Sequence, residues 1–287
     1  MVEHTVLLDA QARAAAPGSF IELSDGFTHY ELAGPDEAQV VVLVHGFSVP
    51  YYIWDPTFTA LAAAGLRVLR YDLFGRGFSD RPKVTYNADL FDRQLLGLLD
   101  ALGLRKPVDL VGLSMGGAIV VNFADRHPER LRKLALIDPA GLPMPRPAIA
   151  GLIKAPLLGD LLISLFGMQF LLSSQGQDLH RQDNVSEFQE KYRVQLRYAG
   201  FKRAILSTIR YGPLYDETAV FQRVGAQLRP ILLIWGREDR TIPFEISDKV
   251  RLALPNAEFH AIEDAGHIPR YEKPEQVNPI LVEFFRR

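Results

Sequence analysis

The segment 112–116, with the sequence GLSMG, matches the pattern Gly-x-Ser-x-Gly, which is typical of a serine nucleophile. An apolar run at 107–111 predicts a short strand before it, and a second apolar run at 118–124 predicts a helix after it. A strand-to-helix turn this tight strains the backbone of Ser114, and only glycine-sized neighbours avoid a clash with it. We therefore expect the Ser114 hydroxyl to stand at the carboxyl edge of a sheet. A helix-capping turn can match the same five positions, so the remaining chain must supply an oxyanion hole, a base and an acid.

The elements around this turn alternate between short β-branched runs and helical patterns, which predicts a mostly parallel sheet flanked by helices. An antiparallel pair is predicted at 20–32, with its turn at Asp25-Gly26. The other predicted strands are 40–44, 67–71, 108–113, 133–137, 231–235 and 257–261. The predicted helices are 51–65, 85–102, 116–127, 243–253 and 274–286.

One interval, 141–225, interrupts this alternation, because it contains helical periodicity and several prolines but no strand pattern. We predict a helical cap of about 85 residues there, inserted between two core strands and lying over their carboxyl ends. The core domain would then consist of residues 1–140 and 226–287.

Composition excludes several classes of function. The chain has 287 residues, of which 48% are hydrophobic and 23% charged, as in a globular protein with a full core. A net charge of −2 and a pI near 6.4 offer no basic surface, so no nucleic-acid partner is expected. The absence of cysteine excludes disulfides, thiolate metal sites and a cysteine nucleophile.

The sequence also bears on secretion and on insertion into a membrane. We expect no signal peptide in the first residues, because they lack a basic region and Asp9 interrupts the only apolar run. The most apolar stretch, 148–172, is broken by Lys154, Pro156 and Asp160 and so predicts no membrane span. We expect a cytoplasmic protein.

The serine pattern between a strand and a helix, the His45-Gly46 pair after the strand 40–44 and the strand–helix alternation together resemble the α/β-hydrolase fold. Within that fold the chain is similar to capped serine hydrolases, namely esterases and monoacylglycerol lipases. The resemblance covers nearly the whole chain but is specific only in the core. It implies an α/β fold in which a helical cap is inserted between core strands.

The resemblance implies a catalytic triad in the chain order Ser114, Asp239, His267. His267 lies in a turn-rich loop after the last predicted strand, from which it can reach Ser114 as general base. Asp239 follows an apolar strand at the same edge, where its carboxylate can accept a hydrogen bond from the imidazole. Asp138, at the end of the strand 133–137, is the rival acid, and its other role would be to cap a turn.

The resemblance also implies an oxyanion hole. In this fold the N–H group of the residue after His-Gly points into the site, which assigns Phe47 as the first donor, and the N–H of Met115 would be the second. His45 is expected to brace the loop. The loop 71–80, YDLFGRGFSD, resembles a family loop in which Asp72 would hold its neighbours. Arg76 could meet a substrate carboxylate, but we expect it to be solvated at the surface.

We interpret the chain as a serine carboxylic-ester hydrolase that acts through an acyl-enzyme on a small apolar ester, with monoacylglycerols as candidate substrates. Metal ions and organic cofactors have no part in this scheme. Haloalkane dehalogenases and epoxide hydrolases of this fold are excluded, since they use an aspartate where this chain has Ser114. The apolar cap segments 149–153 and 157–166 predict core packing, an acyl-chain tunnel or both, with transient contact between the cap and a lipid surface.

Three alternatives share the triad. Carbon–carbon hydrolases of ring-cleavage products also have the cap, but they usually carry a glycine-rich stretch after His-Gly, whereas this chain has FSVPY at 47–51. Haloperoxidase-like relatives typically lack so large an insertion. The third alternative is a ligand receptor that keeps the triad yet turns over little substrate.

Overall fold

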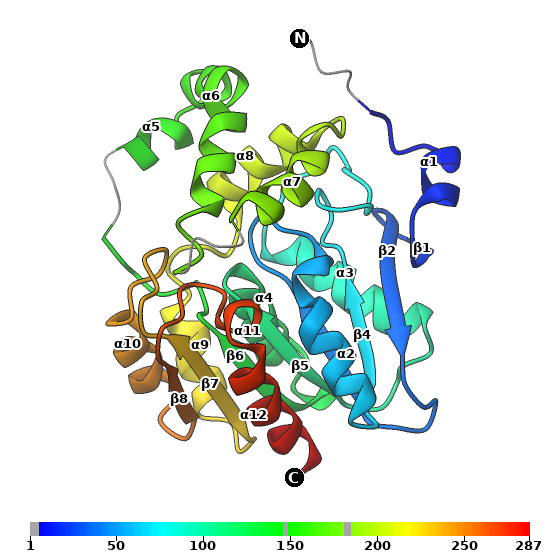
Figure 1. Ribbon diagram of the computed structural model, residues 1–287, viewed down its shortest axis with the longest axis vertical. Helices are drawn as coiled ribbons and strands as arrows, with labels where there is room; N and C mark the ends of the chain where they lie inside the picture. The colour runs from blue at the N-terminus through cyan, green and yellow to red at the C-terminus, as the bar shows by residue number, and fades with distance from the viewer. Residues whose placement is uncertain (1–5, 146–148, 181–184) are drawn as a thin grey trace.

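The computed structural model describes residues 6–145, 149–180 and 185–287 (Figure 1). These residues form an eight-stranded sheet in the order β1-β2-β4-β3-β5-β6-β7-β8. Pairing is antiparallel between β1, β2 and β4 and parallel across the rest of the sheet. The strands are β1 Ser19–Leu23, β2 Gly26–Ala33, β3 Val40–Val44, β4 Arg67–Tyr71, β5 Val108–Leu113, β6 Leu131–Ile137, β7 Ile231–Gly236 and β8 Glu258–Ile262. The predicted mostly parallel sheet is thereby confirmed.

The N-terminal hairpin differs from the prediction by one position. Leu23 pairs with Gly26, so the two-residue turn is Ser24-Asp25 rather than Asp25-Gly26. Gly26 begins β2 with a φ of +136°, and a Cβ atom there would come within 2.8 Å of the Asp80 carboxylate. Gly26 is therefore needed because the start of β2 lies close to Asp80, and not because of the turn.

Both faces of the sheet are covered by helices (Figure 1). Helices α3 Ala88–Ala101, α4 Met115–Arg126, α9 Thr218–Gly225 and α10 Ile246–Ala253 pack on one face, and α2 Asp55–Ala63, α11 Pro269–Glu272 and α12 Pro274–Arg286 pack on the other. Shorter elements are α1 Ala10–Ala15 and the 3₁₀ turns η1 Tyr51–Trp54 and η2 Pro128–Arg130.

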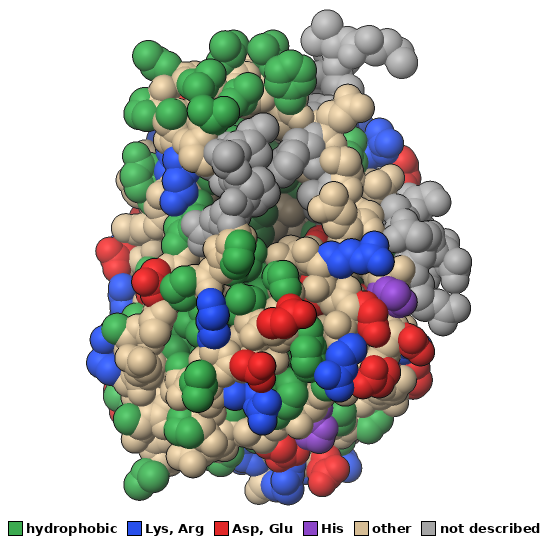
Figure 2. All heavy atoms as spheres, turned by 90° about the vertical axis from the view of Figure 1, so that its left-hand side faces the viewer, with side chains coloured by type: hydrophobic (Ala, Val, Ile, Leu, Met, Phe, Trp, Pro, Cys, Tyr) green, Lys and Arg blue, Asp and Glu red, His purple; other side chains and the backbone are tan. Residues whose placement is uncertain are grey.

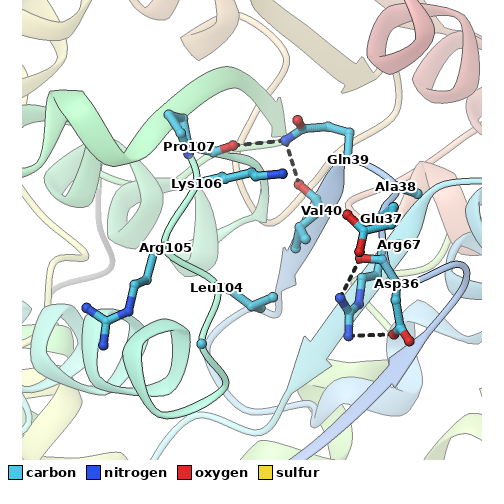
Figure 3. A pocket seen from close by; sticks show the side chains of 11 residues that line it. Asp36, Glu37, Ala38, Gln39, Val40, Arg67, Leu104, Arg105, Lys106 and Pro107 are labelled. Carbon is cyan, nitrogen blue, oxygen red and sulfur yellow. Dashed lines mark hydrogen bonds and ion pairs between the residues drawn. The ribbon is translucent and has the colours of Figure 1, made fainter.

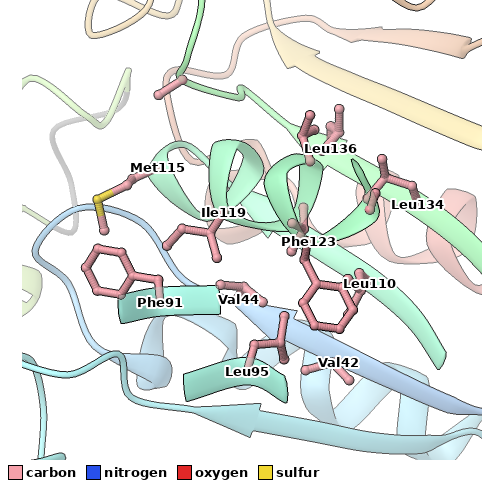
Figure 4. Packing of buried hydrophobic residues seen from close by; sticks show 14 of the residues in the cluster. Val42, Val44, Phe91, Leu95, Leu110, Met115, Ile119, Phe123, Leu134 and Leu136 are labelled. Carbon is pink, nitrogen blue, oxygen red and sulfur yellow. The ribbon is translucent and has the colours of Figure 1, made fainter. Parts of the chain in front are cut away.

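Strand β3 illustrates how the sequence fills both layers. Its side chains are almost all apolar and buried, and they alternate between the two clusters: Val42 and Val44 belong to one, Val41 and Leu43 to the other. Figure 4 shows Val42 and Val44 in the cluster that includes Ile119 of α4. A strand buried on both faces holds the loop that follows it in a fixed place.

The insertion between β6 and β7 contains α5 Ile149–Lys154, α6 Leu158–Gln175, α7 Val185–Leu196 and α8 Phe201–Tyr211, which lie together beyond the carboxyl ends of the strands (Figure 1). The Gly141 carbonyl accepts a hydrogen bond from the Glu217 N–H at 2.6 Å, which joins the two ends of the insertion. The next helix, α9, packs with the core through Phe221 and Val224. The boundaries of the cap, 141 and 225, remain a prediction.

Among the described residues, no helix is long and apolar enough to cross a membrane. The apolar helix α6 instead buries part of its surface within the cap, through Ile163 and Leu171.

Candidate active site

Ser114 stands at the turn between β5 and α4 with φ of 53° and ψ of −121°, a conformation that is strained for a residue with a side chain. The neighbouring glycines make the turn sterically accessible. A Cβ on Gly112 would lie 2.4 Å from the Gly116 carbonyl oxygen, and one on Gly116 would lie 2.2 Å from the Val44 carbonyl oxygen. The GLSMG pattern therefore forms the strained strand–turn–helix arrangement expected from the sequence.

His267 lies in the loop between β8 and α11, and its Nδ1 is 2.7 Å from Oδ2 of Asp239. The second oxygen of Asp239 accepts hydrogen bonds from the N–H groups of Thr241 at 2.8 Å and Ile242 at 2.9 Å. These two donors fix the carboxylate, and the carboxylate in turn fixes the imidazole, so that Nε2 is the ring nitrogen free to act as a base.

The pKa of His267 reflects two opposing effects. Burial disfavours the imidazolium and lowers the pKa, while the charge of Asp239 and its hydrogen bond raise it more strongly, so the pKa lies above the ordinary histidine value. Ser114 and His267 line the same cavity. Among the described residues, the His267 ring bonds to Asp239 and not to the Ser114 hydroxyl.

Asp138, the rival acid, directly follows β6 with a φ of 44° and is completely buried. Its Oδ1 accepts a hydrogen bond from the Gly236 N–H at 2.9 Å, and it does not bond to His267. Burial and the adjacent charge of Asp239 raise the pKa of Asp138 well above the usual carboxyl range. Of the two aspartates, the structure therefore brings Asp239 to the histidine and leaves Asp138 beside it.

Asp138, Asp239 and His267 offer ligand atoms within 4.8 Å of one another, the spacing of a metal site. The hydrogen bond between His267 and Asp239 already occupies the atoms that would face a cation. This geometry fits an acid–base pair better than a ligand set.

The two predicted oxyanion donors flank Ser114. Met115 opens α4, and Phe47 follows Gly46, on which a Cβ atom would lie 3.3 Å from the Ser114 Cβ. Among the described residues, neither the Phe47 nor the Met115 N–H donates a hydrogen bond to a protein group. Both are therefore available to an oxyanion formed on a carbonyl attacked by Ser114.

His45 braces the loop that carries Phe47. Its Nδ1–H donates to the Gly46 carbonyl at 2.9 Å, and its Nε2 accepts from the Leu73 N–H at 2.9 Å. Burial lowers the pKa of His45 to about 4, so the ring is neutral near pH 7. Both ring nitrogens are committed to the backbone, and His45 cannot serve as the base.

The structure corrects the expectation for Arg76, which is completely buried rather than solvated. Asp72 does hold its neighbours: its carboxylate accepts hydrogen bonds from the N–H groups of Tyr51 and Phe78 and lies 2.7 Å from Nδ1 of His29. The sequence pattern identified the loop but gave no sign that Arg76 turns inward.

The cavity at Ser114 has a volume of about 420 Å³. Its walls combine apolar side chains of the core and cap with a few polar groups, among them Asp178, Arg240 and Thr241. Arg240 is exposed and makes no hydrogen bond or ion pair with another described residue. Burial raises the pKa of Asp178, whose carboxylate accepts a hydrogen bond from the Thr241 hydroxyl at 2.6 Å.

A second cavity, of about 360 Å³, lies at the opposite edge of the sheet, where β3 and β4 begin (Figure 3). Among its polar groups, Arg67 pairs with Asp36 at 2.9 Å and the Gln39 amide donates to the Pro107 carbonyl at 3.0 Å. It contains no serine or histidine among its described lining residues. The chemistry predicted from the sequence therefore belongs to the first cavity.

The chain is similar to known proteins in both sequence and fold. The family model described as the alpha/beta hydrolase fold matches residues 39–274. A curated relative, the 2-hydroxy-6-oxo-6-phenylhexa-2,4-dienoate hydrolase of Comamonas testosteroni, is 31% identical, and the match covers 99% of each chain.

Two solved structures are similar over the same length. A meta-cleavage product hydrolase of Pseudomonas fluorescens has a TM-score of 0.78 at 25% identity, with 94% of this chain and 97% of the other covered. A thermophilic esterase of Thermogutta terrifontis has a TM-score of 0.80 at 25% identity, with coverages of 94% and 98%. The curated relatives favour the carbon–carbon hydrolase alternative over the esterase interpretation.

Proposed function

The chain belongs to the alpha/beta hydrolase fold family, and we propose that it hydrolyses a carbon–carbon bond in a ring-cleavage product of the 2-hydroxy-6-oxo-dienoate class. The observation that carries this proposal is the 31% identity, over 99% of the chain, to a relative whose name states that activity. A match of that length includes the cap as well as the core, and the cap contributes to the walls of the cavity at Ser114.

The chemistry of the cavity supports the proposal. A substrate of this class carries a ketone at one end of a conjugated chain and a carboxylate at the other. The apolar walls suit the conjugated chain, and Ser114 and His267 suit the ketone. The guanidinium of Arg240, which has no partner among the described residues, suits the carboxylate. An uncharged ester has no group that requires Arg240.

The reaction starts from the keto tautomer of the substrate. The Ser114 oxygen bonds to the ketone carbon while His267 takes the hydroxyl proton, and the Phe47 and Met115 N–H groups stabilise the oxyanion. The bond from the ketone carbon to the neighbouring methylene carbon then breaks. Its electron pair passes through the conjugated chain to the distant carbonyl oxygen, and His267 returns the proton to that dienolate, which leaves as a 2-hydroxydienoate. Water attacks the acyl-Ser114 ester, and a carboxylic acid departs as Ser114 is restored.

Ester hydrolysis is the second candidate, because two observations favour it. The loop after His-Gly, FSVPY at 47–51, lacks the glycine-rich stretch usual in carbon–carbon hydrolases. A thermophilic esterase is also among the similar structures, with a TM-score of 0.80. The acyl-enzyme steps are the same in both reactions, and only the leaving group differs.

We also propose that the cap contacts an anionic lipid surface transiently. Leu157, Leu161, Leu165 and Phe166 are each more than half exposed, and apolar side chains gather at the cap end of the molecule (Figure 2). The segment 141–225 has ten Lys and Arg against seven Asp and Glu, whereas the whole chain has 32 against 34. An apolar tip on a basic segment suits the interface of an anionic bilayer.

A direct comparison of substrates tests the proposed reaction. The purified protein is incubated with 2-hydroxy-6-oxo-6-phenylhexa-2,4-dienoate, with p-nitrophenyl esters from acetate to palmitate and with monoacylglycerols, each beside the Ser114→Ala variant. We expect multiple turnovers of the dienoate at a kcat/KM above that of any ester. Rapid ester turnover with an unchanged dienoate spectrum would establish the second candidate, and a single slow turnover would indicate a receptor.

A further inference from the structure

Arg76 makes three hydrogen bonds that join separate parts of the molecule. Its Nε donates to the Phe47 carbonyl at 2.8 Å, its Nη1 to the Phe74 carbonyl at 3.1 Å and its Nη2 to the Thr208 hydroxyl at 2.9 Å. Phe47 carries a proposed oxyanion donor, and Thr208 lies in the cap helix α8. A single buried side chain therefore touches both the oxyanion loop, residues 45–49, and the cap.

The charge of Arg76 has no carboxylate partner among the described residues, since all three acceptors are neutral oxygens. Burial lowers the pKa of Arg76 to about 10, which leaves it protonated near neutral pH. The rings of Phe47, Tyr86 and Phe91 lie 5.7, 5.9 and 5.7 Å from its guanidinium carbon and attract the charge. A buried cation is nevertheless costly, and apolar side chains of similar volume often stabilise a fold more. The three hydrogen bonds that Arg76 makes fit a role in holding its acceptors in place.

Helix α8 lies directly against the loop that carries Arg76. A Cβ atom on Gly75, whose φ is +86°, would come within 2.6 Å of the Ala204 Cβ. The Tyr86 N–H donates to the Ser207 hydroxyl at 3.1 Å. The contact between Arg76 and α8 therefore forms only while this helix is docked on the core.

Arg76 contacts α8 on one side and Phe47 on the other. The Phe47 carbonyl is held by Arg76, and the Phe47 side chain packs, with Val49, against the cap cluster that includes Tyr192 and Phe201. The φ and ψ angles of Phe47 link this fixed carbonyl to the N–H on the opposite side of the same residue. Loss of the Arg76 contact would let the residue rotate and move the N–H away from Ser114.

We propose that Arg76 is a positioning residue that couples the docking of α8 to the placement of the Phe47 N–H in the oxyanion hole. The proposal rests on the serine chemistry proposed for Ser114 and does not depend on which substrate is cleaved. It predicts that tetrahedral species on Ser114 are stabilised only when the cap is seated.

The test compares three variants. Arg76→Met removes the charge and all three hydrogen bonds at similar volume. Thr208→Val removes the link between Arg76 and the cap, together with the hydrogen bond from the Thr208 hydroxyl to the Ala204 carbonyl within α8. Arg203→Met is the matched control, because Arg203 also ties α8 to the core, through the carbonyls of Arg81 and Pro82, without touching the oxyanion loop.

Two measurements separate positioning from folding: kcat and KM on the substrate that the wild type turns over, and inhibition by phenylboronic acid, which forms a tetrahedral adduct with the serine. For Arg76→Met we expect kcat and phenylboronic acid affinity to fall together, by ~10- to 100-fold, with little change in KM. Thr208→Val should show a smaller loss of the same kind, and Arg203→Met should match the wild type in both measurements.

The outcomes are distinct. If the wild type binds no phenylboronic acid and no fluorophosphonate labels Ser114, the proposed serine chemistry fails. If the wild type does bind and Arg76→Met matches it in kcat and inhibition, the inference about Arg76 is overturned. An effect of Arg76→Met with none for Thr208→Val would overturn the coupling to the cap, and equal losses in Arg203→Met would mean that cap docking alone matters.

Discussion

Asp138 and Asp239 bring their carboxyl groups together behind His267, and only Asp239 is bonded to the imidazole. Two buried carboxyl groups this close cannot both ionise cheaply, so one retains a proton. Burial and the charge of Asp239 raise the pKa of Asp138 well above the usual carboxyl range, which favours the proton on Asp138. A protonated Asp138 can donate a hydrogen bond to Asp239 and stabilise the ionised form that His267 needs.

The two aspartates should therefore respond differently to the same substitution. Asp239→Asn removes the charge that orients His267, and we expect kcat to fall by ~10³- to 10⁴-fold. Asp138→Asn resembles the protonated aspartate, because its oxygen can accept from the Gly236 N–H and its amide can donate to Asp239, so kcat should change less than ~10-fold. Steady-state kinetics on both variants checks this, and the reverse ranking would make Asp138 the catalytic acid.

The raised pKa of Asp138 also predicts how the free energy of unfolding changes with pH. A carboxyl group whose folded pKa lies above its unfolded value contributes stability that is complete below the unfolded pKa and is lost as the pH rises. Asp138→Asn should therefore become more stable relative to the wild type across a pH range that begins near the ordinary carboxyl value of 3.8 and extends upward. Urea unfolding across this range measures the difference, and parallel curves for the two proteins would show that Asp138 ionises normally.

The pH dependence of catalysis follows from His267. A general base must be neutral, and its pKa is raised above the ordinary 6.5 by Asp239 despite the opposing effect of burial. We expect kcat/KM to increase with pH, with its midpoint above 6.5. The residual activity of Asp239→Asn should show a lower midpoint, since the charge that raises the pKa is gone. A wild-type midpoint below 6.5 would contradict the geometry.

Arg240 distinguishes a charged substrate from an uncharged one. The dienoate carboxylate would pair with this guanidinium, so Arg240→Gln should raise KM for the dienoate by ~10-fold and leave p-nitrophenyl butyrate unaffected. Arg237→Gln is the matched control, because Arg237 is exposed on the same loop but pairs with Glu263 at 3.0 Å and does not line the cavity. Equal effects of Arg240→Gln on both substrates would place the dienoate carboxylate elsewhere.

The sequence predicts well those elements whose pattern is contained in a few neighbouring residues. The apolar run of β3 and the glycine spacing around Ser114 each carry their own steric or hydrophobic reason, and the elements formed as predicted. The pairing of His267 with Asp239 follows because parallel strands end at a common edge, where their loops must meet.

The features that the sequence could not predict depend on distant partners. Arg76 looks like a solvated loop charge until Thr208, 132 positions away, supplies an acceptor. A contact between two side chains that are far apart in the chain produces no periodic pattern in the sequence, so the sequence alone does not predict it.

The last prediction concerns the cap tip. Replacing Leu157, Leu161 and Phe166 by serine removes exposed apolar surface without opening a core, so binding to phosphatidylglycerol vesicles in a flotation assay should fall ~10-fold or more. The matched control replaces Leu228 and Leu252, which are also highly exposed but lie on the core domain. Because burial of apolar area drives insertion, the control should bind vesicles as the wild type does. Equal binding by all three proteins, or none by the wild type, would exclude lipid contact through this tip.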